Sequence, residues 1–254
     1  MKMISLIKEI TDRILNGGEI SKEEALRLIA IKSDDEETLS ALYDGANKLR
    51  EKFVGSKADL CTIMNAKSGK CSEDCKFCAQ SVHYNTGIQE YDLLNYDILI
   101  ERAKEMESCG AHRFSLVTSG KGVEDIDFDR LVEIYKKLSQ DTNLKLCASH
   151  GIISLEQAKK LKNAGVIMYH HNVETSPKNY DNICTTHPYD ARVETINNVI
   201  DSGLEICCGG ILGLGEDTVD RIEMAFQIKK LGVKSIPMNV LNPVEGTPMG
   251  HNEV

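Results

Sequence analysis

The sequence lacks any long run of apolar residues. Its hydrophobic stretches are a few residues long, whereas a membrane-spanning helix needs roughly 20. The first residues, Met-Lys-Met-Ile-Ser-Leu-Ile-Lys-Glu-Ile, mix charged and apolar side chains and lack the features of a signal peptide, an unbroken apolar stretch and a small-residue cleavage site. We therefore expect no membrane segment and no export, and we predict a cytoplasmic protein.

Clusters of basic residues are also missing. The chain has 39 Asp and Glu against 30 Lys and Arg, a formal net charge of −9, which argues against nucleic acid as the main partner. Nine cysteines in a chain without an export signal indicate reduced thiols that serve metal or redox chemistry. A disulfide framework is not expected in a cytosolic protein of this size.

The order of predicted elements divides the 254 residues into two parts. Residues 1–55 contain only helical patterns, for example Leu6, Ile10 and Ile14 at four-residue steps, and we interpret them as an N-terminal helical cap. Residues 56–254 alternate short β-rich runs with helices, which is typical of parallel βα units. The six predicted strands are 59–66, 111–118, 144–150, 166–174, 204–212 and 233–241.

Three cysteines follow the first predicted strand at close spacing, in Lys-Cys-Ser-Glu-Asp-Cys-Lys-Phe-Cys. An iron–sulfur cube normally takes one protein ligand per iron, so Cys71, Cys75 and Cys78 would leave one iron open. One alternative is a zinc site completed by His83, although structural zinc usually has paired Cys-x-x-Cys or His spacing. Another is a coincidence of buried free thiols.

This segment resembles the radical S-adenosylmethionine (SAM) superfamily. Phe77 inside the cysteine array and Gly69 before it match that superfamily, and Glu-Asp-Cys-Lys-Phe-Cys-x-Gln-Ser narrows the resemblance to the biotin synthase family. The resemblance implies a [4Fe–4S] cluster on Cys71, Cys75 and Cys78. Its open iron would bind SAM, which one electron cleaves to a 5′-deoxyadenosyl radical.

The resemblance also implies an α/β fold, a TIM-type barrel of the radical SAM class. Many members of the superfamily have six βα units, whereas biotin synthases resemble an eight-unit barrel. We therefore expect that this sequence covers about six units and lacks the last two. An open edge leaves backbone groups unpaired, so a partner segment is expected there.

Active sites of such barrels lie at the carboxyl ends of the strands. On the fourth predicted strand, His170, Asn172 and Glu174 share a face, and polar residues on an inward face indicate a site more often than a core. By the resemblance, Asn172 and Glu174 contact the substrate and the ribose of SAM. Glu174 stands where aspartate is usual and His170 where asparagine is usual, and a purely structural His170 stays an alternative.

Further positions match the family along the second half of the chain. By the resemblance, Arg192 binds the SAM carboxylate, Gly209 and Ile211 contact the adenine, and Asn239 binds the ureido group of the substrate. Without the family, Arg192 would be a surface residue and the glycine-rich segment 209–216 a weak signal that also occurs at phosphate sites.

Biotin synthases hold a second, sacrificial iron–sulfur cluster on three strand cysteines and one arginine. Cys147 and Cys207 map to two of these ligands, Ser115 occupies the third position, and the arginine belongs to the missing seventh strand. Cys61 lies on the first predicted strand, and alternate strands supply one layer of a barrel interior. We therefore hypothesise an auxiliary cluster of unknown composition on Cys61, Cys147 and Cys207.

The alternative for these three cysteines is that they are buried free thiols. Cys208 follows Cys207 directly, so it would face the cluster only at a bulge. Cys109 and Cys184 are interpreted as structural or incidental.

The function implied by the resemblance is radical insertion of sulfur into dethiobiotin, with the auxiliary cluster as the sulfur donor. Implied partners are a flavodoxin or ferredoxin that donates electrons and a second copy of the chain in a homodimer. One alternative is another radical SAM enzyme with this core, a hydrogenase-cofactor maturase or a methylornithine-type mutase, which needs no sacrificial sulfide. A second is a non-catalytic iron–sulfur or zinc module.

Overall fold

The computed structural model describes residues 2–252, which divide into two compact units at the junction between Ala58 and Asp59. The first unit consists of α1 (Lys2–Leu15), α2 (Lys22–Ile29) and α3 (Glu36–Phe53). A capping box starts α2: the Ser21 hydroxyl accepts from the Glu24 N–H, and the Glu24 carboxylate accepts from the Ser21 N–H. The all-helical prediction for this segment matches these elements.

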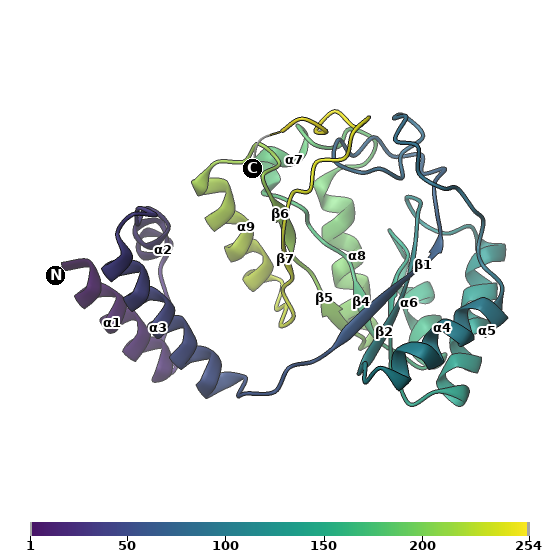
Figure 1. Cartoon of the computed structure of the whole chain (residues 1–254), viewed down its shortest axis with the longest axis horizontal. Helices are drawn as coiled ribbons and strands as arrows, with labels where there is room; N and C mark the ends of the chain where they lie inside the picture. The colour runs from purple at the N-terminus through teal and green to yellow at the C-terminus, as the bar shows by residue number, and fades with distance from the viewer. Residues whose placement is uncertain (1, 253–254) are drawn as a thin grey trace. The chain divides into compact units, whose positions relative to one another are not determined.

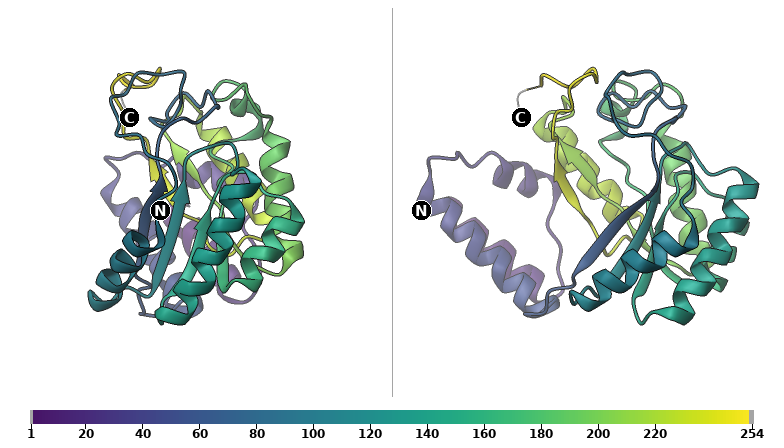
Figure 2. Two further views of the ribbon diagram at one scale, coloured as in Figure 1. Left: turned by 90° about the vertical axis from the view of Figure 1, so that its right-hand side faces the viewer. Right: turned by 45° about the vertical axis from the view of Figure 1, so that its right-hand side comes forward.

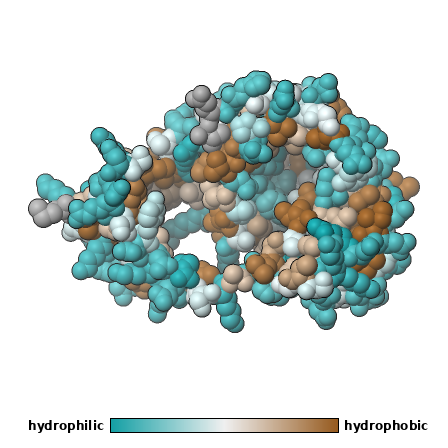
Figure 3. All heavy atoms as spheres, in the orientation of Figure 1, coloured by the Kyte–Doolittle hydropathy of each residue, from teal (hydrophilic) through white to brown (hydrophobic). Residues whose placement is uncertain are grey.

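Within the first unit, α1 packs against α3. Ile7, Ile10 and Thr11 are the buried residues of α1. Gly45 allows α3 to approach them closely, because a Cβ at that position would lie 2.6 Å from the Thr11 hydroxyl oxygen. The face of this unit visible in Figure 3 is mainly hydrophilic, as expected for helices that bury one side only.

The second unit is built on parallel strands that follow chain order. Five of them, β1 (Cys61–Lys67), β2 (Arg113–Thr118), β3 (Lys145–Ser149), β4 (Val166–His170) and β5 (Glu205–Cys207), form one sheet. A second sheet contains β6 (Gly210–Leu212) and β7 (Met238–Val240). Helices connect successive strands except β5 and β6 (Figure 1), so the α/β architecture of repeated βα units agrees with the prediction.

The helices of this unit lie on the outer side of the strands (Figure 2). They are α4 (Tyr96–Ser108), α5 (Asp125–Asp141), α6 (Leu155–Asn163), α7 (Pro177–Tyr180), α8 (Tyr189–Ser202) and α9 (Thr218–Lys230). Along β2, successive side chains point alternately to the helices and to the inside of the barrel. Phe114 and Leu116 are fully buried in the hydrophobic core. Arg113, Ser115 and Val117 point to the opposite, inner face.

Three predicted strands differ from the observed strands by more than two residues at an end or are split in two. The predicted strand 204–212 is two strands, β5 and β6, separated by Cys208 and Gly209. Single bridges from Cys207 to Ser235 and from Glu174 to Gly210 connect the two sheets there. The predicted strand 233–241 shortens to β7, which begins directly after Pro237, a residue without a backbone N–H for a ladder.

The fourth predicted strand, 166–174, also ends early, at His170. Its last predicted residue, Glu174, has a left-handed backbone with φ of 68°, which no strand residue adopts. Asn172 and Glu174 therefore lie in the loop after β4, and the prediction that they are strand residues is wrong.

Long segments gather at the carboxyl ends of the strands. Segment 68–95, which follows β1, and the C-terminal segment 241–252 lie at this end in both orientations (Figures 1 and 2). A hydrogen bond from the Met249 N–H to the Lys76 carbonyl, 3.3 Å, joins the two segments. Within residues 2–252, no helix combines the length and apolar character needed to span a bilayer.

Candidate active site

A cavity of about 370 Å³ lies at the carboxyl ends of β1 to β4. Its wall carries all three cysteines of the triplet and the polar residues predicted on and after the fourth strand. The predicted site residues that it brings together are Cys71, Cys75, Phe77, Cys78, His170, Asn172, Glu174 and Arg192.

The triplet is held in a loop that closes on itself. Gly69, with φ of 76°, turns the chain after β1, and its N–H donates to the side-chain oxygen of Gln80. The Cys71 N–H donates to the Gln80 carbonyl at 3.0 Å, and the Cys78 N–H to the Cys75 carbonyl at 2.9 Å. The loop therefore directs three thiols into one cavity. Burial raises the pKa of Cys71 and of Cys78, so iron must displace protons when it binds there.

Opposite the thiols, an amide, a carboxylate and a guanidinium form a connected group. The Arg192 Nη1 donates to the Asn172 carbonyl at 3.1 Å and lies 3.5 Å from Glu174 Oε1. Asn172 Nδ2 donates to Glu174 Oε2 at 3.3 Å, and Asn172 Oδ1 accepts from the Gly209 N–H at 2.9 Å. The nearby charge of Glu174 raises the pKa of Arg192 although burial opposes this shift.

This arrangement fits a [4Fe–4S] cluster together with SAM. Three thiolates supply a cluster with three ligands, a guanidinium can pair with a carboxylate, and a carboxylate accepts hydrogen bonds from ribose hydroxyls. In addition, His171 Nε2 on the cavity wall is buried and has no hydrogen-bond partner among the described residues. Such an orphaned polar atom points to a ligand that is bound in the working protein.

The remaining predicted residues lie beside this wall. Ile211 on β6 and Phe77 both pack against a small apolar cluster of Ile183, Leu214, Leu241 and Met249. Gly209 reaches the site through its hydrogen bond to Asn172. Asn239 pairs in register with Ile211 but is exposed on β7. The structure does not bring Asn239 to the cavity wall.

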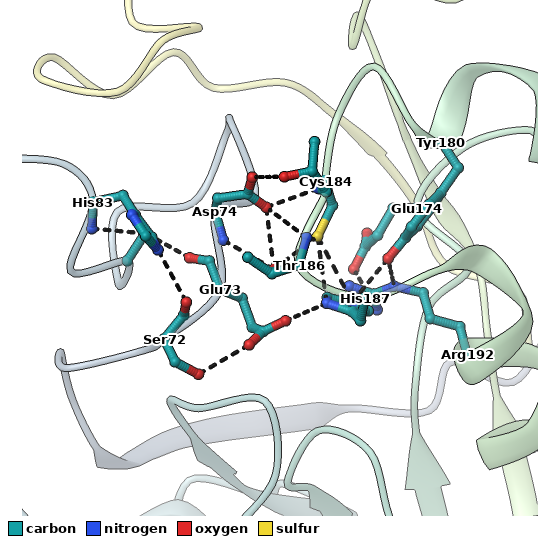
Figure 4. Close-up of polar contacts among 12 residues, drawn as sticks. Ser72, Glu73, Asp74, His83, Glu174, Tyr180, Cys184, Thr186, His187 and Arg192 are labelled. Carbon is teal, nitrogen blue, oxygen red and sulfur yellow. Dashed lines mark hydrogen bonds and ion pairs between the residues drawn. The ribbon is translucent and has the colours of Figure 1, made fainter.

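A second loop, residues 183–187, packs directly against the cysteine loop. The Lys76 N–H donates to the Ile183 carbonyl at 3.0 Å, and the Asp74 carboxylate accepts from the N–H groups of Thr185 and Thr186. Figure 4 shows Glu73 and Asp74 facing this loop, with His187 beside Glu73. These contacts position one loop against the other.

The contact between the loops includes a cysteine to which sequence reasoning assigned no function. The ligating atoms of Cys75, Cys184 and His187 lie within 4.8 Å of one another, and all three side chains are buried. The hydrogen bond to Cys75 lowers the pKa of Cys184 to about 4 and raises that of Cys75. The only signal in the sequence was a Cys-x-x-His pair shortly before Arg192. His83 instead lies 3.0 Å from the Ser72 carbonyl, which does not favour the zinc alternative that used it.

Comparison with known proteins identifies the family. The Radical SAM superfamily matches residues 66–228. The biotin synthase of Clostridioides difficile is 55% identical over 252 residues, which cover 99% of this chain and 78% of that protein. The biotin synthase of Acetivibrio thermocellus is 53% identical over 248 residues, covering 98% and 75%. The chain belongs to the biotin synthase family.

Solved structures show the same fold. A methylornithine synthase matches with a TM-score of 0.85 at 21% identity, over 95% of this chain and 70% of that one. The hydrogenase maturase HydG from Carboxydothermus hydrogenoformans matches with a TM-score of 0.80 at 20% identity, over 98% and 59%. These structures confirm the predicted barrel fold, and the superfamily match and the biotin synthase relatives confirm the prediction of a radical SAM enzyme. Membership of the biotin synthase family implies a [4Fe–4S] cluster and SAM, and favours this family over the maturase and mutase alternatives.

A second cavity, of about 690 Å³, extends toward the amino ends of β1 and β2 in this biotin synthase family member. Cys61, Arg113 and Cys207 lie on its wall. The Cys61 thiol contacts that of Cys147, and this contact lowers the pKa of Cys61 to about 7 and raises that of Cys147. The structure thus brings the three cysteines of the proposed auxiliary site near one another. Cys208, by contrast, is fully buried in the hydrophobic core.

Two further features of the second cavity indicate what kind of ligand it could bind. Ser235 Oγ lies 3.4 Å from Cys207 Sγ. The Arg113 Nη1 is buried, lacks a hydrogen-bond partner among the described residues, and is 4.0 Å from the Glu205 carboxylate. A buried guanidinium N–H without a partner beside three thiols fits an anionic group such as a sulfide-bearing cluster.

Proposed function

We propose that this radical SAM enzyme inserts sulfur into dethiobiotin to form biotin. The observation that carries the proposal is the single cavity in which the three thiols of one loop face the Asn172, Glu174 and Arg192 group, in a chain of the biotin synthase family.

When bound to Cys71, Cys75 and Cys78, a [4Fe–4S] cluster supplies the electron that cleaves SAM. The chain's own part is to bind and orient. The Arg192 guanidinium, held by the Asn172 carbonyl, pairs with the carboxylate of the methionine moiety. The Glu174 carboxylate accepts hydrogen bonds from the ribose hydroxyls, while Phe77 and Ile211, which pack against the same apolar cluster, offer apolar contacts for the adenine.

Dethiobiotin is the proposed substrate, bound through its ureido group. Asn172 lies on the cavity wall and Asn239 on β7, and amide side chains both donate and accept hydrogen bonds as a ureido group requires. The substrate must lose hydrogen at two carbons and gain sulfur at both. The barrel contributes placement and the exclusion of water.

The sulfur donor in this proposal is an auxiliary iron–sulfur cluster on Cys61, Cys147 and Cys207. Support comes from the contact between Cys61 and Cys147, from Cys207 on the same cavity wall as Cys61, and from the unpartnered Nη1 of Arg113. The competing interpretation, three free thiols, leaves that guanidinium N–H without a partner, which is costly for a buried charged donor.

We also propose a flavodoxin or ferredoxin as the electron donor, because the reaction consumes single electrons. The proposed oligomer is a homodimer, which the family resemblance implies. Reduction of the purified protein by each carrier tests the electron donor. Light scattering of the protein as it elutes from a size-exclusion column tests the oligomeric state. A chain that elutes only as a monomer would refute the dimer.

The test of the whole proposal is anaerobic reconstitution followed by incubation with dethiobiotin, SAM and a reductant. Biotin and 5′-deoxyadenosine should form together, and Cys75→Ala should form neither. Production of 5′-deoxyadenosine without biotin would favour another radical SAM reaction. A colourless protein that holds zinc would favour the non-catalytic module.

A further inference from the structure

Asp74 joins the cysteine loop, residues 71–78, to the loop 183–187 through several hydrogen bonds. Its Oδ1 accepts from the Thr185 N–H at 2.8 Å, from the Thr186 N–H at 3.2 Å and from the Thr186 hydroxyl at 3.1 Å. Its Oδ2 accepts from the Thr185 hydroxyl, and its own N–H donates to the Thr186 hydroxyl oxygen at 3.3 Å. Figure 4 shows Asp74 facing Thr186 across this contact.

The cysteine loop keeps its three thiols together by bonds that do not involve the Asp74 side chain. The Cys71 N–H donates to the Gln80 carbonyl at 3.0 Å, and the Cys78 N–H donates to the Cys75 carbonyl at 2.9 Å. Loss of the Asp74 carboxylate should therefore leave the thiols close to one another. What it should change is where the loop lies relative to its neighbour.

The neighbouring loop, 183–187, leads to the residue that faces the thiols across the cavity. It connects α7, which ends at Tyr180, to α8, which carries Arg192 in its first turn. The Tyr180 hydroxyl accepts from the Arg192 Nε at 2.6 Å, so the two ends of this connection are bonded to each other. The cysteine loop is thus attached, through Asp74, to the segment that holds the guanidinium.

We propose that Asp74 is a positioning residue that fixes the cysteine triplet relative to Arg192 and thereby sets the affinity for SAM. The inference rests on the proposed function in two respects, that the triplet binds a cluster and that Arg192 binds the SAM carboxylate. In that function the methionine moiety contacts both the open iron and Arg192, so its binding depends on how the two are placed. 5′-Deoxyadenosine has no methionine moiety and does not depend on that placement.

The test compares variants of the anaerobically reconstituted protein by equilibrium dialysis with SAM and, separately, with 5′-deoxyadenosine, and iron and sulfide are measured in each. Asp74→Ala should keep its iron and bind SAM about tenfold more weakly, because a misplaced carboxylate loses part of a charge-assisted contact. Its affinity for 5′-deoxyadenosine should equal that of the wild type. Asp92→Ala is the matched control, since it removes an exposed carboxylate of segment 68–95 that pairs with Lys70, and both affinities should stay unchanged.

A second set of variants tests the contact from the other loop. Thr186→Val removes a hydroxyl that donates to Asp74 and keeps the shape of the side chain, so it should weaken SAM binding less than Asp74→Ala does. In the double variant the two losses should not add, because both act through one contact. Asp74→Asn keeps an acceptor oxygen and should retain part of the affinity that Asp74→Ala loses.

Three results would overturn the inference: wild-type affinity for SAM in Asp74→Ala, additive losses in the double variant, or equal losses for SAM and 5′-deoxyadenosine, which would indicate a general loss of packing. Should Asp74→Ala take up no iron, Thr186→Val decides. A loss confined to SAM in that variant supports the inference, and any other result refutes it. A wild-type protein that holds no cluster or binds no SAM would instead refute the proposed function.

Discussion

The Arg192 Nε donates a hydrogen bond of 2.6 Å to the Tyr180 hydroxyl, and this bond sets the orientation of the guanidinium. Nη1 donates to the Asn172 carbonyl, so the guanidinium group faces the cavity in one fixed orientation. An arginine in the first turn of α8 would otherwise be free to choose among several rotamers.

Tyr180→Phe should weaken SAM binding about tenfold, because loss of a hydrogen bond to a charged group costs about 1.5–3 kcal/mol. Calorimetric titration of the reconstituted protein measures this. Tyr189→Phe is a matched control: its hydroxyl is buried and has no hydrogen-bond partner among the described residues, so affinity should not fall. Equal losses in both variants would contradict the assigned role of the bond.

Cys61→Ser should remove the auxiliary cluster and leave the iron of the first cluster, about four per chain. Adding Ser115→Cys to that variant should restore the lost iron and biotin formation, because Ser115 pairs in register with Cys147 on β3 and occupies the inner face of β2. Iron and sulfide analysis with a biotin assay measures both effects. Cys109→Ser serves as the control, and unchanged iron in Cys61→Ser would exclude Cys61 as a ligand.

Gly209→Ala should destabilise the junction between the two sheets by more than about 3 kcal/mol, because the added Cβ would lie 1.7 Å from the Pro237 carbonyl oxygen. The free energy of unfolding in urea reports the loss. Gly87→Ala is the comparison, since a Cβ there meets nothing within 4 Å and costs only the left-handed strain of about 1–2 kcal/mol. Similar values for the two variants would argue against the close approach.

His150 should make folding stability depend on pH. Burial lowers its pKa to about 3, from 6.5 in an exposed setting, and it contacts Thr118 and Tyr135 at 3.0 Å each. Above pH 6.5 both folded and unfolded chains hold it neutral. Below that pH only the unfolded chain binds the proton, so stability falls by up to about 1.4 kcal/mol per pH unit toward pH 3.

Urea unfolding between pH 6.5 and 5 measures this slope. His150→Gln should reduce the slope by close to that amount, whatever its effect on absolute stability, and the exposed His251→Gln should not change it. A His150→Gln slope equal to that of the wild type would show that this imidazole does not carry the effect.

Spacing and residue chemistry were sufficient to predict the cysteine triplet and the βα order. Three thiols on one short loop lie close together because of their sequence spacing, independently of the fold of the rest of the chain. Period-two alternation likewise placed Cys61 on an inner face, whereas Cys207 was assigned by the family match, and both lie on one cavity wall.

The positions that local reasoning misplaced depend on distant contacts. Asn172 and Glu174 were predicted on a strand, but Glu174 adopts a left-handed backbone and bridges to Gly210 on the other sheet. Cys184 meets Cys75 only because the loops 71–78 and 183–187 pack together, and no periodicity within either loop encodes that meeting. Asn239 depended on the family match alone, and it is exposed on β7.

The two cavities share the inner face of the same strands. Ile63 of β1 and His170 of β4 line the first, while Cys61 and Met168 of the same strands line the second. On each strand these lining residues are two positions apart, about 7 Å, so a molecule that reaches both cavities has to lie along the strands. Under the proposed function, hydrogen is removed beside the first cavity and sulfur is added beside the second. The barrel would then select substrates by length, because a molecule of another length reaches only one of the two cavities.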